Sequence, residues 1–205
     1  MRAVFRFLAA VMIVSGVLLI GDAAATVLWQ EPVSAFVSKR QQTHLEAQLI
    51  DPPEKVKKRV AARKPLPGDA IGKLGIPAIG VSEYVVEGTD TGNLRKGPGH
   101  YPDTPLPGEK GTVAIAGHRT TYGAPFRDVN KLRRGQVITL DMTYGRFVYR
   151  VERVKIVDDQ DLSVLKPVGY NRLMLSACHP LYSAAQRIIV FARLAKRARS
   201  TVKRT

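Results

Sequence analysis

The sequence predicts an all-β fold with short helices, either a barrel or a sandwich, in the part of the chain that begins near Ala70. Short segments rich in β-branched and aromatic residues follow one another there, and glycine or proline bounds them. Only small helical turns, at 91–97 and 125–133, are expected between these segments. The seven strand candidates are 70–77, 81–86, 111–117, 136–142, 146–157, 172–178 and 187–194.

An apolar run opens the chain. Arg2 and Arg6 precede an uncharged stretch over 7–21, and after Asp22 the apolar character resumes as far as Trp29, which we expect at a membrane interface. The run approaches the roughly 20 residues of a spanning helix, and basic residues before it place the remainder outside the cell. A cleaved secretory signal is the alternative, because "DAAAT" has Ala-x-Ala spacing. Both interpretations export the chain.

Two further segments flank the predicted β domain. Residues 32–50 have the makings of a short amphipathic helix, and a Pro-bracketed basic stretch follows, so 31–69 are expected to form an extracellular spacer. The basic, non-periodic end of the chain is expected to be a solvated tail. The predicted organisation is a membrane anchor over 1–30, the spacer over 31–69, a catalytic β-barrel over 70–195 and the tail over 196–205.

Composition limits the function classes. A chain of 205 residues with 45% hydrophobic residues can hold one ordinary domain plus attachments. A formal net charge of +15 favours polyanionic partners such as nucleic acid, acidic lipid or wall polymer. Because the chain is exported, nucleic acid is not the expected partner. Acidic lipid and anionic wall polymer are the two polyanions that remain.

Cys178 is the only cysteine of this exported chain. Extracellular cysteines are usually paired, and this one has no partner within the chain. A buried inert thiol, an intermolecular disulfide and a nucleophile are the three explanations.

Three residues of catalytic type lie at predicted strand ends. His118 follows one strand directly, Cys178 closes another, and Arg187 opens the next after a short loop. If these last two strands pair as a hairpin, the thiol and the guanidinium lie at the same end of the sheet. A cysteine can attack a carbonyl, an arginine can stabilise the oxyanion, and a histidine can protonate a leaving amine.

Two segments resemble the sortase family of cysteine transpeptidases. "LSACHPLYSAAQR" (175–187) is similar to the segment in which Thr/Ser-x-x-Cys is followed by arginine, and "VAIAGHRTTYGAPF" (113–126) resembles the strand that ends in the family's histidine. The basic anchor also matches, and "GHRTTYGAPF" with "CHP" is most similar to class E, the housekeeping type. The resemblance covers roughly 70–194 and implies a closed eight-stranded barrel of the sortase type. Ser176 and Ala177 depart from the more usual Thr-Thr or Ser-Thr.

The resemblance implies a reaction without a cofactor. Cys178 would cleave an LAxTG or LPxTG-like sorting signal between Thr and Gly and form a thioacyl enzyme, His118 would transfer protons, and Arg187 would hold the carbonyl or oxyanion. A peptidoglycan-precursor amine would then accept the surface protein. The implied location is the membrane, with the catalytic domain outside. Tyr122 matches the tyrosine associated with LAxTG, and Ser176 and Ala177 are expected to meet the substrate.

Other polar residues rank lower. His179 would point away from the face of Cys178, His100 lies in a turn, and His44 lies in the spacer. One cysteine and scattered histidines lack zinc spacing, and the acidic run at 158–161 lacks the glycine of a calcium loop. A pilin-polymerising sortase and a non-catalytic module that binds anionic wall polymer are the alternative functions.

Overall fold

The computed structural model describes residues 2–28, 32–50, 54–166 and 168–198. A closed barrel with the strand order β1-β2-β3-β4-β7-β8-β6-β5 forms its centre. The strands are β1 (Ala70–Ile76), β2 (Val81–Glu87), β3 (Gly99–His100), β4 (Thr112–Ala116), β5 (Val137–Met142), β6 (Gly145–Asp158), β7 (Arg172–His179) and β8 (Gln186–Ala198). The predicted barrel is confirmed, and all seven predicted strands are present. Two-residue β3 was not predicted.

Helices are short within the barrel and longer before it. The helical elements are α1 (Arg2–Leu28), α2 (Pro32–Ile50), α3 (Glu54–Ala61), α4 (Thr91–Leu94), η1 (Pro77–Ile79), η2 (Val129–Lys131) and η3 (Leu162–Leu165). The helical turns predicted at 91–97 and 125–133 correspond to α4 and η2. Trp29 lies outside the described residues.

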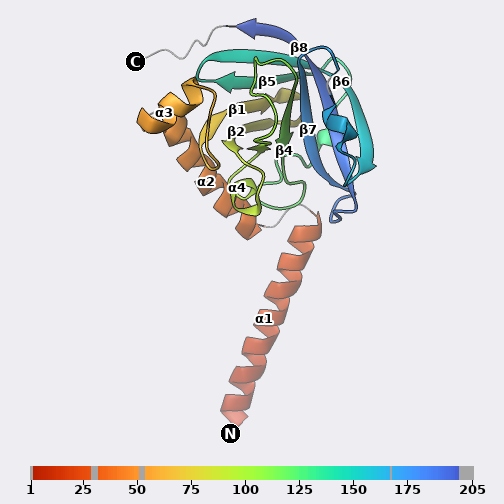
Figure 1. Cartoon of the computed structure of the whole chain (residues 1–205). Helices are drawn as coiled ribbons and strands as arrows, with labels where there is room; N and C mark the ends of the chain where they lie inside the picture. Colours follow the sequence, from red (N-terminus) through yellow and green to blue (C-terminus); the bar gives the residue numbers. More distant parts are fainter. Residues whose placement is uncertain (1, 29–31, 51–53, 167, 199–205) are drawn as a thin grey trace.

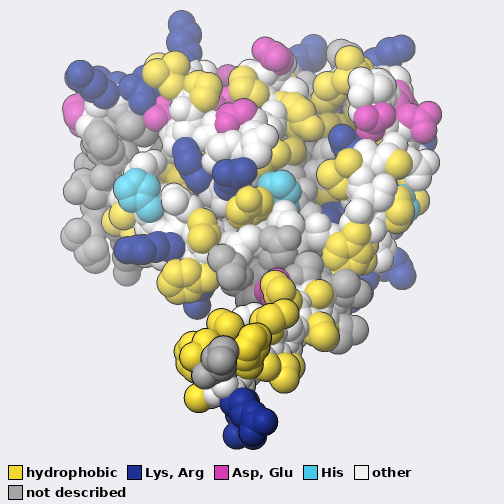
Figure 2. Space-filling view, turned by 90° about the horizontal axis from the view of Figure 1, so that it is seen from below, with side chains coloured by type: hydrophobic (Ala, Val, Ile, Leu, Met, Phe, Trp, Pro, Cys, Tyr) yellow, Lys and Arg dark blue, Asp and Glu magenta, His cyan; other side chains and the backbone are white. Residues whose placement is uncertain are grey.

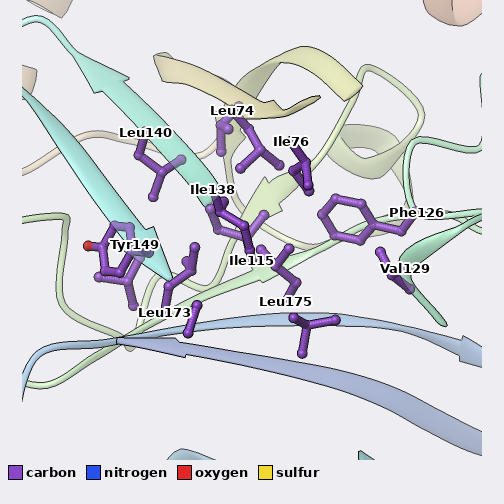
Figure 3. Close-up of a cluster of buried hydrophobic side chains, with 14 of the residues drawn as sticks. Leu74, Ile76, Ile115, Phe126, Val129, Ile138, Leu140, Tyr149, Leu173 and Leu175 are labelled. Carbon is purple, nitrogen blue, oxygen red and sulfur yellow. The ribbon is translucent and has the colours of Figure 1, made fainter. Parts of the chain in front are cut away.

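The barrel interior is filled by side chains from alternate positions of the strands (Figure 3). Leu173 and Leu175 of β7 point inward and meet Ile115 of β4 and Ile138 of β5. Because successive side chains of a strand point to opposite faces, residues 174, 176 and 178 face outward. Phe126 closes the interior near one end of β4.

The chain before the barrel packs against it, a contact that the sequence did not predict for the expected extracellular spacer. α2 and α3 lie along one side of the barrel (Figure 1). Leu45 of α2 is 1% exposed against β1 and β2, and Val60 of α3 is 3% exposed. Gln42 of α2 exchanges hydrogen bonds with both backbone groups of Tyr84, with N···O distances of 3.0 and 2.6 Å. A polar side chain therefore helps to hold α2 against the barrel. The hydrophobic periodicity of the sequence does not reveal such a contact. The limits at 31–69 stay a prediction.

The predicted basic tail also begins inside the sheet. Lys196 and Arg197 continue β8 and pair with Val148 and Phe147 of β6. The Arg197 guanidinium lies 5.5 Å from the centre of the Phe147 ring, which gives this basic position a contact in the barrel. Residues 199–205 lie outside the described part of the chain.

We expect Leu45→Ala to lower the free energy of unfolding by about 3 kcal/mol, because it leaves a cavity between α2 and the barrel. Denaturant unfolding followed by circular dichroism of the whole chain in detergent measures this change. Leu66→Ala is the matched control, because Leu66 is 54% exposed and its truncation should change stability by less than about 0.5 kcal/mol. Equal effects of the two changes would contradict the docking of α2.

Candidate active site

β7 and β8 bring Cys178 and Arg187 together. The two strands are antiparallel, and Cys178 lies directly opposite Arg187 in their register. Side chains of directly opposed residues project from the same face of a sheet. The hairpin expected from the sequence is therefore confirmed, and the two side chains share the outer face at one end of the barrel.

β4 brings His118 to the same end. β4 runs parallel to β7 with Ala116 level with Ser176, and Gly117 N donates to Ser176 O at 3.0 Å. The strand pairing ends at Ala116, and His118 follows two residues later in the loop that leaves this end of β4. Cys178 thus has Arg187 opposite it on β8, and the loop that carries His118 leaves the neighbouring strand on its other side.

The loop after β4 holds His118 by its backbone. His118 O accepts a hydrogen bond from Phe126 N at 3.0 Å, which closes the neck of the loop. Gly117 lies against the Phe126 ring, and a β-carbon at residue 117 would stand 2.5 Å from Phe126 Cδ2. Real β-carbons do not approach a ring so closely, so a glycine before His118 is required for the buried ring to fit beneath the loop.

Burial tunes the imidazole of His118. Burial lowers the pKa of His118 and has the larger effect, and the positive charge of Arg95 lowers this pKa further. His118 is therefore neutral at pH 7. Its Nε2 is buried and has no hydrogen-bond partner within the described residues. That nitrogen is available to exchange a proton with a reactant.

Only one nitrogen of the Arg187 guanidinium is used in hydrogen bonds to the described residues. Its Nη1 donates to Ala184 O at 2.7 Å and to Gln186 O at 3.0 Å, which ties the group to the β7–β8 loop. In the part of the chain that the structure describes, its Nε and Nη2 donate to no protein acceptor. These donors could meet a substrate carbonyl next to Cys178.

A buried cluster covers much of the outer face of β7 and β8. It contains Met174, Ile189 and Phe191, against which Tyr101 and Leu165 pack. Cys178 itself is only half-buried. An extended peptide can therefore approach the thiol.

Tyr122 lies beside His118. The two ring centres are 5.1 Å apart, and the Arg95 guanidinium lies 5.6 Å from the centre of the tyrosine ring. Tyr122 has a φ of 51°, and its N donates to Ser34 Oγ of α2 at 3.0 Å. A helix from the predicted spacer therefore supports the loop that carries both rings.

Ser176 and Ala177 differ in what they could offer a substrate. Ser176 is on the outer face with Cys178 but is 5% exposed, whereas the side chain of Ala177 packs in the barrel interior. Of Ala177, only the backbone could meet a ligand.

The other histidines have partners away from Cys178 Sγ. His100 is buried and pairs with Glu87 at 2.9 Å, and His44 contacts Gln48 on α2. His179 Nδ1 is 3.2 Å from Arg119 Nη1. Among the described residues, no group of three or more His, Cys, Asp or Glu side chains is arranged to hold a metal ion.

Arg119 is a buried residue of this region that the sequence did not single out. It follows His118 directly, is 5% exposed and reaches the end of β7. In a chain with 32 lysines and arginines, its only signal was its place beside the candidate histidine.

Comparison with known proteins gives a consistent result. Residues 74–195 match the model of the Sortase domain. The chain is 38% identical to Sortase D of Bacillus subtilis over 65% of this chain and 68% of that protein. It is 32% identical to Sortase SrtE1 of Streptomyces coelicolor over 62% of this chain and 41% of that protein.

Solved structures give the same picture. The fold is similar to sortase E of Streptomyces avermitilis, with a TM-score of 0.60 and 35% identity over 65% of this chain and 93% of that one. It is also similar to a Sortase D5 transpeptidase of Clostridium perfringens, with a TM-score of 0.66 and 27% identity over 78% and 99%. Relatives named D and E both occur, so the class E resemblance stays a prediction.

Proposed function

The chain belongs to the sortase family of cysteine transpeptidases, and from this premise we propose that it cleaves a C-terminal sorting signal between Thr and Gly and joins the new Thr carboxyl to an amine. The observation that carries the proposal is the alignment of Cys178 with Arg187 across β7 and β8, with His118 in the loop that follows the neighbouring strand β4. This order suits attack on a carbonyl, with an oxyanion donor on one side and a proton carrier on the other.

The first half of the reaction uses the neutral imidazole. Cys178 Sγ attacks the Thr carbonyl carbon while its proton passes to His118, and Arg187 donates to the carbonyl oxygen as negative charge develops there. The C–N bond to Gly then breaks, and the proton moves from His118 to the leaving amine. A thioester between the substrate Thr and Cys178 remains.

The second half reverses the proton path. An acceptor amine attacks the thioester carbon and gives its proton to His118. The C–S bond breaks, the thiolate of Cys178 takes the proton, and an amide bond joins the two substrates. We propose that the acceptor is a peptidoglycan-precursor amine and the donor a surface protein; a pilin lysine is the alternative acceptor.

The substrate preference is assigned to the loop after β4. Tyr122 stands beside His118 and is held by α2, so its ring can contact the signal residues that precede the scissile bond. We assign an LAxTG preference over LPxTG to this ring. Ser176 contributes at most a small surface beside Cys178.

The proposed location is the membrane. Within the described residues, one helix is long and apolar enough to span a bilayer, over Arg2–Ala25, and α1 extends away from the barrel as a rod (Figure 1). Figure 2 shows hydrophobic side chains along this rod and basic side chains at its far end. The basic end suits a cytoplasmic side, with the barrel outside.

A peptide assay with the whole chain in detergent tests the proposal. Peptides that contain LAxTG, LPxTG or a scrambled motif are incubated with hydroxylamine as the amine. We expect a Thr hydroxamate and a free Gly-terminated fragment, measured by mass spectrometry, with LAxTG cleaved faster than LPxTG. No product with either motif would overturn the function, and a reversed order would overturn the assignment to Tyr122.

A further inference from the structure

Arg119 is the most connected polar side chain next to the candidate site. Its Nη1 lies 3.3 Å from Cys178 O and 3.2 Å from His179 Nδ1. Its Nη2 donates to Asn130 Oδ1 at 3.0 Å and to Arg127 O at 3.2 Å, and its Nε donates to Arg127 O at 3.3 Å. One side chain thus joins the His118 loop, η2 and the end of β7.

Arg119 is buried as a cation among neutral acceptors. It is 5% exposed, and none of its hydrogen-bond partners is a carboxylate. Burial lowers the pKa of Arg119, and Asp128 and Arg127 act on it in opposite directions. Because an arginine stays protonated in proteins, a positive charge lies directly behind the backbone of Cys178. Burying such a charge is costly, and a neutral donor would tie these segments together at less cost.

The contact with His179 has a consequence of its own. A guanidinium only donates hydrogen bonds, so His179 Nδ1 is the acceptor in this contact. The histidine next in sequence to Cys178 is therefore engaged by Arg119. His118, whose Nε2 has no hydrogen-bond partner among the described residues, is left as the candidate proton carrier.

We propose that Arg119 is a positioning residue, which ties the end of β7 to the His118 loop so that Cys178 and His118 keep their relative positions, and which places a fixed positive charge behind the attacking sulfur. This charge favours the negative sulfur that forms when the thiol proton passes to His118. Arg119 itself touches neither the sulfur nor the substrate. Only the expected effect on kcat rests on the proposed function; the positioning of Cys178 by Arg119 does not.

Arg172 provides a matched control. It is buried to 3% exposure at the first residue of β7, and it donates to Thr112 Oγ1, Val164 O and Lys166 O. It is thus a second buried arginine bonded to neutral acceptors, and it lies at the end of β7 away from Cys178. A general loss of β7 packing would affect Arg119 and Arg172 variants alike.

The test compares Arg119→Met, Arg119→Lys and Arg172→Met in the whole chain in detergent. We expect Arg119→Met to lower kcat for the peptide reaction by about 100-fold, as small misplacements do, with KM changed by less than about 3-fold. Arg119→Lys should recover part of the loss. Arg172→Met should lower the melting temperature about as much as Arg119→Met does, but it should leave kcat within about 3-fold of the parent value.

Alkylation of Cys178 by iodoacetamide separates this inference from the proposed function, since it requires no peptide. The labelling rate at neutral pH should fall in Arg119→Met and stay unchanged in Arg172→Met. Asn130→Ala, which removes one anchor of the guanidinium at an exposed residue, should lower the rate in the same direction even if Arg119→Met does not fold. Equal labelling and equal kcat in the Arg119 and Arg172 variants would overturn the positioning role.

Discussion

Cys178→Ala is expected to abolish both cleavage of the sorting-signal peptide and hydroxamate formation, a loss of at least about 10⁴-fold in kcat. The reason is chemical, because the thioester cannot form without the sulfur, and no other described nucleophile lies opposite Arg187 in the β7–β8 register. Mass spectrometry of the whole protein should detect an acyl adduct in the parent chain and none in the variant.

The control for this change is Cys178→Ser. Cys178 is half-buried at the end of a strand, so either variant should fold with a melting temperature close to that of the parent. The serine hydroxyl is a far weaker nucleophile beside one neutral histidine. Residual transpeptidation by the folded Cys178→Ala protein would contradict the role of the thiol. Because the chain has one cysteine, thiol alkylation cannot come from another residue, and the modified site is checked by peptide mass spectrometry.

The barrel could be predicted because its strands carry their signal locally. Strand β6 alternates buried and exposed residues along most of its length, and glycine or proline bounds most strands. Strand β3, with two residues, is too short to show any period. The docking of α2 was missed for another reason, since one buried leucine and several polar side chains, Gln42 and Ser34 among them, hold it to the barrel.

In the candidate site, the sequence could predict only the positions of residues at the ends of strands. The pairing of Cys178 with Arg187 follows from a hairpin, which the sequence can indicate, and the structure has this register. The approach of Ser34 to Tyr122 joins residues 88 positions apart, and Arg119 reaches Cys178 across 59. Such contacts depend on the closed barrel and leave no pattern in the sequence.

His118→Gln is expected to lower kcat for the peptide by about 10³-fold or more, because the imidazole that carries the proton from the thiol to the leaving amine is lost. Glutamine keeps a polar planar side chain and should preserve the neck of the loop, which is made by the backbone of His118 and Phe126. Stopped time courses with the peptide and hydroxylamine measure the loss. Near-normal activity of His118→Gln would assign proton transfer to another group.

The pH dependence gives this role a second, independent readout. Because burial and Arg95 lower the pKa of His118, the neutral imidazole should persist below the usual histidine value of about 6.5, and kcat/KM should fall only in more acidic solution. Arg95→Gln removes a positive charge that opposes the imidazolium, so the pKa of His118 should rise. The acid limb should therefore move to higher pH.

Arg133→Gln is the matched control for that shift. Arg133 and Arg95 are both exposed. Arg133, however, donates to Asn130 O of η2 and to Leu132 O just after it, and it is absent from the causes that lower the pKa of His118. Its replacement should leave the acid limb in place. An acid limb that stays fixed in Arg95→Gln, or that moves to lower pH, would show that the limb reports a group other than His118. An upward shift confined to Arg95→Gln would identify the neutral imidazole as the form that takes the proton from Cys178.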